Sequence, residues 1–213
     1  MIVYGIGDAS FKAGEKAVGG QMILLGNKNN DKVVPILWKT KLIKQVCHSA
    51  KDGETRNIVR VVDLSCFAAN QISELIHGKV KLNKFNIENK IPVKIFTDSL
   101  STLESIASTH QVERRLMRSS IADLKQKLED KDVQSYCWME DSDMVADILT
   151  KEMKDKWGLN EVMHENRLRC IKKEENIVTE EAGEFLIRNR TVKAKKFDQK
   201  VKKHFNQKKN AGE

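Results

Sequence analysis

Two apolar runs of this 213-residue chain each end in an aspartate. In "IPVKIFTDSLSTLESI", residues 91–106, apolar side chains alternate as far as Phe96, and Asp98 then precedes a segment with helical spacing. Asp8 follows the run "IVYGIG" in the same way. Alternation of this kind is typical of a β-strand that buries at least one face. A carboxylate at the end of such a strand has two interpretations, a turn or helix-capping residue and a ligand at the edge of a sheet.

The order of the predicted elements brings these two aspartates to one edge of a sheet. Strands are predicted over residues 2–7, 17–26, 32–40 and 93–98, and a fifth strand begins at residue 133. A long helix is predicted to end near residue 78, and further helices are predicted over residues 100–108, 113–129 and 143–153. A strand, a helix and a second strand normally form a right-handed parallel crossover, so the fourth strand is expected to lie parallel to the first. We therefore predict an α/β fold with a five-stranded mixed sheet, three antiparallel strands and then two parallel ones, flanked by helices.

Two further acids are expected near the same edge. Glu54 lies four residues before Ile58, on the inward stripe of the long helix, and Asp147 lies early in the last predicted helix, which Ser142 is expected to cap. Without a nearby Lys or Arg, convergent carboxylates repel one another, and Mg²⁺ or Mn²⁺ removes that cost. Each acid also has an ordinary interpretation: Ser49 can cap the long helix with Glu54 as a favourable first-turn acid, and Asp147 can face solvent.

Charge and cysteine usage narrow the class of protein. Lys and Arg number 38 against 30 Asp and Glu, a net charge of +8. Residues 187–213 hold ten of the basic and two of the acidic residues, which is typical of a disordered tail that contacts a polyanion. The four cysteines lie far apart and indicate neither a disulfide framework nor a zinc site. No signal peptide or membrane-spanning run is found, so we expect an intracellular protein, cytoplasmic or nuclear.

The words around the acids resemble the ribonuclease H domain at the end of copia-type (Ty1/copia) retrotransposon Pol polyproteins. The words "YGIGDASF", "SAKDGE" and "TDSLST" resemble the family's YSDADW, SSTEAE and CDNQSA, which aligns Asp8, Glu54 and Asp98 with three of its acids. The word "ADILTK" resembles ADIFTK and aligns Asp147 with the fourth acid, and "LWKTKLIKQ" resembles SWKSKKQ. The resemblance covers about residues 2–153, and its five words stand in the family's order.

The resemblance implies a ribonuclease H-like fold and an endonuclease that hydrolyses the RNA strand of RNA/DNA hybrids with two Mg²⁺ (or Mn²⁺) ions. The catalytic and metal-binding residues that it implies are Asp8, Glu54, Asp98 and Asp147. It also implies a partner, a reverse transcriptase from the same element. Ser99 stands where the family has Asn, and we expect this change to weaken a contact with the nucleic-acid backbone. Charge adds further candidates for nucleic-acid binding: Arg114, Arg118, Lys195, Lys196, Lys202 and Lys203.

Three domains are expected, with one rival function. A ribonuclease H-like domain over 1–156 is followed by a poorly defined extension over 157–187, in which residues 161–187 form a helix or a short hairpin, and by the basic tail over 188–213. The chain begins almost at the first strand, so we interpret it as a fragment of a polyprotein or a separate remnant. The rival is a catalytically inactive or domesticated nucleic-acid-binding protein of the same fold. A DDE-type integrase is disfavoured, because its Glu comes last and Glu54 comes second.

Histidine and tryptophan side chains are not predicted to act directly. We expect His48 and His110 to be ordinary surface or loop residues, and Trp38 and Trp138 to be packed core residues and not platforms for stacked bases.

Overall fold

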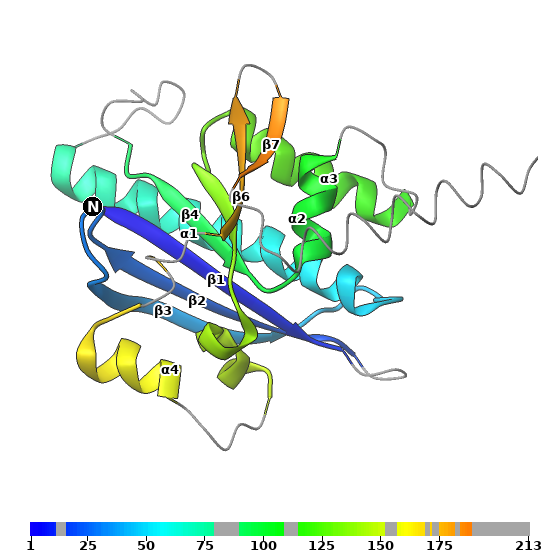
Figure 1. The fold of residues 1–213 in the computed structure, drawn as a ribbon, viewed down its shortest axis with the longest axis horizontal. Coiled ribbons are helices and arrows are strands. Elements are labelled where there is room, and N and C mark those ends of the chain that lie inside the picture. Colours follow the sequence, from blue (N-terminus) through cyan, green and yellow to red (C-terminus); the bar gives the residue numbers. More distant parts are fainter. Residues whose placement is uncertain are drawn as a thin grey trace, which may run out of the picture.

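A seven-stranded sheet forms the centre of the molecule, in the order β3-β2-β1-β4-β5-β6-β7 (Figure 1). The structure, a computed structural model, describes residues 1–11, 16–78, 90–108, 115–151, 157–168, 171, 175–181 and 184–188. The strands are β1 (Ile2–Ser10), β2 (Val18–Gly26), β3 (Val33–Leu42), β4 (Val93–Thr97), β5 (Ser135–Trp138), β6 (Glu175–Glu181) and β7 (Glu184–Arg188). The α-helices are α1 (Ala50–His77), α2 (Leu100–Ala107), α3 (Arg115–Glu129) and α4 (Trp157–Asn160). The other helical turns are 3₁₀ helices η2 (Asp141–Asp143) and η3 (Val145–Leu149) and the π-helical η4 (Glu161–Glu165).

The pairing of the strands confirms the predicted arrangement of β1 to β5, with three antiparallel strands followed by two parallel ones. Strands β1, β2 and β3 are antiparallel, and β4 and β5 lie parallel to β1. The predicted count of five strands is wrong, because β6 and β7 extend the sheet as an antiparallel hairpin beside β5. Residues 161–187, for which a helix or a hairpin was expected, contain both. The predicted domain boundary at residue 156 stays a prediction, although β6 and β7 continue the same sheet.

Helices cover both faces of the sheet. One apolar core lies between the sheet and α1, α2 and α3, and a second lies between the sheet and the segment that holds η3 and η4. In Figure 1, α1 and α4 lie on opposite sides of β1 to β3. Strand β1 is therefore buried on both faces, which explains why its sequence is apolar almost without interruption. Within the described residues, no helix has the length and the apolar character that crossing a bilayer requires.

Helix α1 begins and ends at the residues that the sequence indicates. The Ser49 hydroxyl accepts a hydrogen bond from the Asp52 backbone N–H at 3.3 Å, which caps the first turn. Gly78 ends the helix with φ 80°, a conformation that glycine adopts without a steric cost, and its N–H donates to Glu74 O at 2.9 Å. Because the cap fixes the first turn, the rotation of the helix about its axis directs Glu54 inward, where it is 8% exposed.

The α-helix predicted over residues 143–153 is wrong in its described part. The chain forms η2 and η3 there, and Met144 between them has φ −73° and ψ 89°, outside the helical region. Ser142 is not a cap, because it lies inside η2. Met144, Val145 and Ala146 are all buried, and three consecutive buried residues do not fit the single inward stripe of an amphipathic α-helix. The packing of this segment against the sheet therefore decides its conformation.

Candidate metal centre

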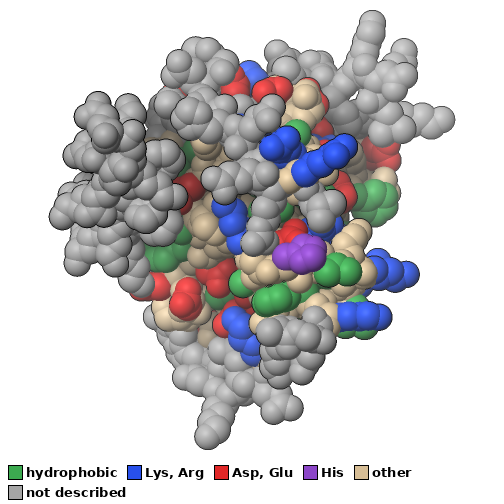
Figure 2. Space-filling model, turned by 90° about the vertical axis from the view of Figure 1, so that its right-hand side faces the viewer, with side chains coloured by type: hydrophobic (Ala, Val, Ile, Leu, Met, Phe, Trp, Pro, Cys, Tyr) green, Lys and Arg blue, Asp and Glu red, His purple; other side chains and the backbone are tan. Residues whose placement is uncertain are grey.

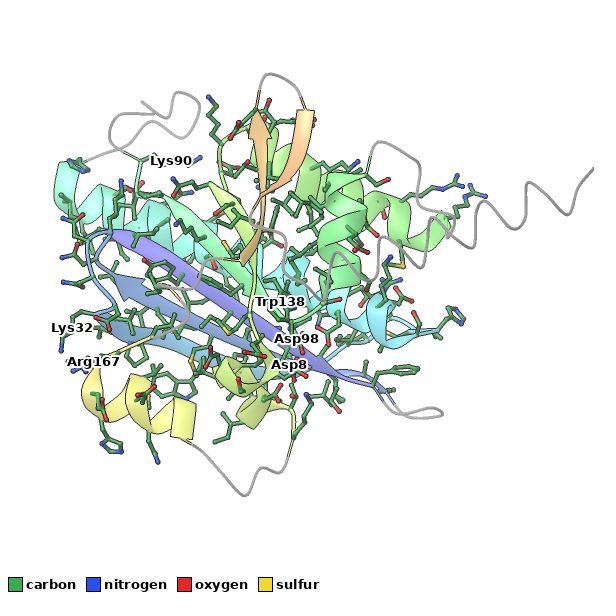
Figure 3. All side chains as sticks on the ribbon, viewed as in Figure 1. Asp8, Lys32, Lys90, Asp98, Trp138 and Arg167 are labelled. Atoms are coloured by element: carbon green, nitrogen blue, oxygen red, sulfur yellow. The ribbon has the colours of Figure 1, made fainter. Side chains whose placement is uncertain are left out.

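Three acids from three elements meet at the carboxyl end of β1 and β4. Asp8 lies inside β1, opposite Gly20 of β2, and not after the strand as predicted. Asp98 directly follows β4, and Glu54 lies near the start of α1. One carboxylate oxygen from each of the three acids lies within 4.8 Å of the others. Figure 3 shows Asp8 and Asp98 in neighbouring positions at this end of the strands.

Two oxygens of this group are buried without a hydrogen-bond partner among the described residues. They are Glu54 Oε2 and Asp98 Oδ1. The other oxygen of Glu54, Oε1, accepts a hydrogen bond from the Ala9 backbone N–H at 3.1 Å, which orients the carboxylate toward the strand ends. A buried charged oxygen without a partner is costly, and an all-oxygen donor set is what Mg²⁺ and Mn²⁺ prefer. The residues present therefore fit a divalent cation.

The pKa values of the group reflect burial and mutual repulsion. Burial, then the charges of Asp98 and Asp8, raise the pKa of Glu54 to about 9. Burial and the charge of Asp8 raise the pKa of Asp98 to about 6. Both shifts have the direction expected of carboxylates that share a site without enough positive charge. A cation bound between these oxygens would favour the ionised forms and release protons.

Asp147 lies beside the group, and a lysine lies between it and Asp8. The Lys151 ammonium donates to Asp147 Oδ1 at 2.9 Å and approaches Asp8 Oδ1 at 3.5 Å. Burial and repulsion from Asp8 raise the pKa of Asp147. Together they outweigh the hydrogen bond from Lys151, which lowers it. The structure thus brings Asp8, Glu54 and Asp98 together, and Asp147 lies beside them and is linked to Asp8 through Lys151. The expectation that no lysine or arginine lies near the acids is wrong. The sequence contained a sign of this lysine, because Lys151 ends the word "ADILTK".

Gly20 allows η3 to approach the sheet closely enough for these contacts. A Cβ at Gly20 would lie 2.9 Å from Ala146 O, a backbone atom that cannot move alone. The close approach brings the Thr150 hydroxyl within hydrogen-bond reach of Asp8 Oδ2. Both oxygens of Asp8 therefore have polar neighbours from the segment after η3, whereas Glu54 Oε2 and Asp98 Oδ1 have no hydrogen-bond partner in the part of the chain that the structure describes.

Asn57 fixes the backbone of β1 and β2 beneath the acids. Its side-chain amide donates to Asp8 O at 2.8 Å and to Gly20 O at 2.9 Å, and its Oδ1 accepts from Gln21 Nε2 at 2.9 Å. A Cβ at Gly19 would lie 2.2 Å from Asn57 Oδ1, so the strand needs glycine there to leave room for the amide. We did not predict this role. The signal was a polar residue three positions after Glu54, on the inward side of an amphipathic helix.

Asp98 and Ser99 are held by neighbouring groups. The Trp138 indole N–H donates to Asp98 O at 3.1 Å, and Trp138 is partly buried. Ser99 precedes α2, so the capping position belongs to Ser99 and not to Asp98, although the Ser99 side chain makes no capping bond. Its hydroxyl lies 2.9 Å from the Thr102 hydroxyl, which lies 3.2 Å from that of Thr55. These contacts between hydroxyls link Ser99 through Thr102 to Thr55, the residue after Glu54.

The other predicted nucleic-acid-binding residues are only partly described. Arg118 is exposed on α3. Five of the predicted residues lie outside the described residues: Arg114, Lys195, Lys196, Lys202 and Lys203. Figure 2 views the molecule from the right-hand side of Figure 1 and shows acidic side chains beside Lys or Arg side chains on this face, with apolar side chains between them.

The prediction that Trp38 packs in the core is wrong. Trp38 is 56% exposed. It lies on β3, an edge strand, where it pairs with Met22 of β2. The chain after η4 meets the start of this strand, where Lys32 and Arg167 form an isolated β-bridge and the Val33 N–H donates to Asn166 O. His48 is exposed, as expected, and His110 lies outside the described residues.

Comparison with known proteins gives structural similarity only. No family model matches the sequence, and no curated protein matches it. The chain is similar to LC11 ribonuclease H1, solved in complex with an RNA/DNA hybrid, at 12% identity and a TM-score of 0.49, with 69% of this chain and 92% of that chain covered.

Two further solved structures resemble the chain. One is ribonuclease H1 from the archaeon Halobacterium salinarum, at 11% identity and a TM-score of 0.49, with 70% of this chain and 94% of that chain covered. The other is the foamy viral protease–reverse transcriptase in complex with double-stranded DNA, at 16% identity and a TM-score of 0.41, with 70% and 90% covered. Because these values are low, we base the function on the geometry of the chain itself.

Proposed function

We propose that this chain is a metal-dependent endonuclease that hydrolyses the RNA strand of RNA/DNA hybrids, and that it derives from a copia-type retrotransposon. We further propose two Mg²⁺ or Mn²⁺ ions as cofactors, a reverse transcriptase of the same element as a partner, and a cytoplasmic or nuclear location. The observation that supports this function is the convergence of Asp8, Glu54 and Asp98 within 4.8 Å, with a buried, unpartnered oxygen on Glu54.

Each acid has a distinct part in this proposal. Asp8, Glu54 and Asp98 would hold one ion, and Asp8 and Asp147 would hold the other. When bound, such ions activate the attacking water and stabilise charge on the leaving 3′-oxygen. The Ala9 N–H and the Trp138 indole hold the segments that carry Glu54 and Asp98, at 3.1 Å in each case. These fixed contacts position the carboxylates before any substrate arrives.

We assign recognition of the substrate to side chains outside the acid group, which consists of Asp8, Glu54, Asp98 and Asp147. Ser99 lies beside Asp98 and has a hydroxyl that can contact the nucleic-acid backbone or a ribose 2′-hydroxyl. Contacts with 2′-hydroxyls in the minor groove distinguish RNA from DNA without reading sequence. Arg118 and the tail lysines at 195, 196, 202 and 203 add contacts with phosphates, as does Arg114.

The test is a cleavage assay on a labelled RNA/DNA hybrid with Mg²⁺, comparing the full chain with Asp98→Asn. We expect the parent to cut the RNA strand only, with little sequence preference, and Asp98→Asn to lose cleavage while circular dichroism shows an unchanged fold. Double-stranded DNA and double-stranded RNA of the same sequence serve as control substrates.

Two outcomes contradict the proposal. If Asp98→Asn cuts the hybrid as fast as the parent does, the activity does not come from this site. If the folded parent binds the hybrid but does not cut it with Mg²⁺ or Mn²⁺, the chain is a catalytically inactive or domesticated nucleic-acid-binding protein.

A further inference from the structure

The acid group has two sides that differ in their positive charge. On one side, Glu54 Oε2 and Asp98 Oδ1 have no hydrogen-bond partner among the described residues. On the other side, the Lys151 ammonium lies 2.9 Å from Asp147 Oδ1 and 3.5 Å from Asp8 Oδ1. The chain therefore supplies its own cation to the Asp147 side and none at bonding distance to the unpartnered oxygens of the Glu54 side.

We propose that Lys151 acts as an internal competitor for the second divalent ion. This inference rests on the proposed function and concerns the order in which that site is loaded. The first ion would bind among Asp8, Glu54 and Asp98, where Glu54 Oε2 and Asp98 Oδ1 have no hydrogen-bond partner within the described residues. A second ion on the Asp8–Asp147 side would bind well only after the Lys151 ammonium has withdrawn, because the ammonium bonds to Asp147 Oδ1 and repels a divalent ion a few ångströms away.

Lys151 can withdraw without disturbing the fold. Its side chain is 44% exposed, whereas Asp8 is 1% exposed and is fixed within β1. A lysine ammonium is a compact charge on a flexible stem, so rotation about its side-chain bonds moves the charge into solvent. Thr150 remains bonded to Asp8 when this happens, because its hydroxyl contacts the other oxygen of that carboxylate.

A bound nucleic acid would favour the withdrawn state. The phosphates of a substrate placed over the acid group are anions that can take up the ammonium of Lys151 as it leaves Asp8 and Asp147. Substrate binding and loading of the second ion are then coupled, since each one favours the same position of Lys151.

The test is a count of bound ions on the full chain without nucleic acid. Free Mn²⁺ is measured by electron paramagnetic resonance during titration of the parent, Lys151→Met and Lys151→Arg. We expect one tight and one weak ion for the parent, and for Lys151→Met a gain of roughly tenfold or more in affinity for the second ion, because a unit charge a few ångströms away is removed. Lys151→Arg keeps the charge and is expected to keep the second ion weak.

Lys127→Met is the matched control, because Lys127 pairs with Asp132 outside the acid group. It is expected to bind both ions as the parent does. A second readout is thermal unfolding: metal-free Lys151→Met should melt below the parent, since Asp8 and Asp147 then repel each other, and Mn²⁺ should raise its melting temperature more than that of the parent.

The outcomes separate this inference from the proposed function. Unchanged or weaker binding of the second ion by Lys151→Met, or an equal gain in Lys151→Arg, overturns the role of Lys151 while the metal centre stands. If neither the folded parent nor folded Lys151→Met binds any ion, the metal centre itself is wrong and both proposals fail.

Discussion

The two ends of β4 and β5 place carboxylates in opposite electrostatic environments. Before these strands begin, Asp132 bonds to two lysines, Lys90 and Lys127, the latter at 3.2 Å. Burial alone would raise the pKa of Asp132, but the hydrogen bonds and charges of the two lysines outweigh it and lower the pKa. At the other end lies Asp98, whose pKa is raised to about 6. Figure 3 shows Lys90 and Asp98 at these opposite ends.

The two environments differ in where the counter-charge comes from. Lysines of the chain neutralise Asp132, whereas Glu54 and Asp98 are left for a cation from outside the chain. Asp132 receives its counter-charge from the chain, so it contributes to stability as it stands. Among the described residues, Glu54 and Asp98 carry buried oxygens without a hydrogen-bond partner, so their ionised forms cost stability until an external cation arrives. Both environments meet at Lys151, because its ammonium pairs with Asp147 and Asp8, whereas Glu54 Oε2 beside them has no hydrogen-bond partner among the described residues.

The largest expected effect concerns catalysis. Removal of one preorganised electrostatic group from an active site commonly lowers the rate by roughly 10²- to 10³-fold, and we expect a loss of this size for hybrid cleavage by Asp8→Asn. The same change at the other end, Asp132→Asn, should leave the cleavage rate close to that of the parent. Initial rates at saturating Mg²⁺ measure both. Equal losses in the two variants would remove the functional distinction between the two ends.

The second effect concerns the support beneath the acids. Asn57→Ala removes the side-chain donor to Asp8 O and Gly20 O, and leaves Gln21 Nε2 without its acceptor. Loss of these buried hydrogen bonds should lower the free energy of unfolding by about 3 kcal/mol.

Urea unfolding measures this loss. The control is Gln126→Ala, which removes a bond to Asp130 on the surface and should cost little. A loss for Asn57→Ala as small as that of the control would show that the acid end does not depend on this network.

The third effect is a change in the free energy of unfolding that is expected to have opposite signs for acids at the two ends of β4 and β5. At pH 7 without metal, Glu54→Gln should raise the free energy of unfolding by about 1 to 3 kcal/mol, because the amide needs no proton and keeps an oxygen for the Ala9 N–H. Asp132→Asn should lower it by about 1 kcal/mol, because the partly exposed lysine pairs are lost. Denaturant unfolding in a chelating buffer measures both. Changes of the same sign would contradict the electrostatic contrast.

The fourth effect, the smallest when taken over a single pH unit, is a pH dependence of the metal-free protein. The pKa of Glu54 is about 9 in the folded state against an ordinary 4.5, so between these values the folded state binds more protons than the unfolded state. Stability should therefore fall as the pH rises from about 5 to 9, by at most about 1.4 kcal/mol per pH unit from this one group. Asp98 adds to the fall below about pH 6.

Melting temperatures across this pH range measure the dependence. The slope should flatten in Glu54→Gln, and Mg²⁺ should reduce it in the parent because a bound ion favours the ionised carboxylate. A metal-free parent whose stability rises between pH 5 and 9 would mean that Glu54 is ionised in the folded state.

Local patterns in the sequence predicted most of the fold. Apolar or alternating runs and the turn at 27–31 located β1 to β5, and the spacing of apolar residues, with Ser49 before and Gly78 after, located α1. The failures lie where packing between distant segments overrides a local pattern. Residues 141–149 form two 3₁₀ helices because Met144, Val145 and Ala146 are all buried against the sheet, and Trp38 is exposed because β3 is an edge strand.

The four acids could be chosen from the sequence, but the sequence did not indicate which of them pair with a lysine of the chain. The sequence predicted that Asp8, Glu54, Asp98 and Asp147 lie at one edge, from the expected strand ends and helix starts and from the resemblance of the words around them, although Asp8 lies inside β1 and Asp147 in a 3₁₀ helix. Only the tertiary structure decided that Lys151 lies between Asp8 and Asp147. That contact depends on the close approach of η3 to Gly20, and so on distances between segments that are about 130 residues apart in the chain. Local periodicity carries no information on such distances, because they are set by how the buried surfaces of several elements pack together.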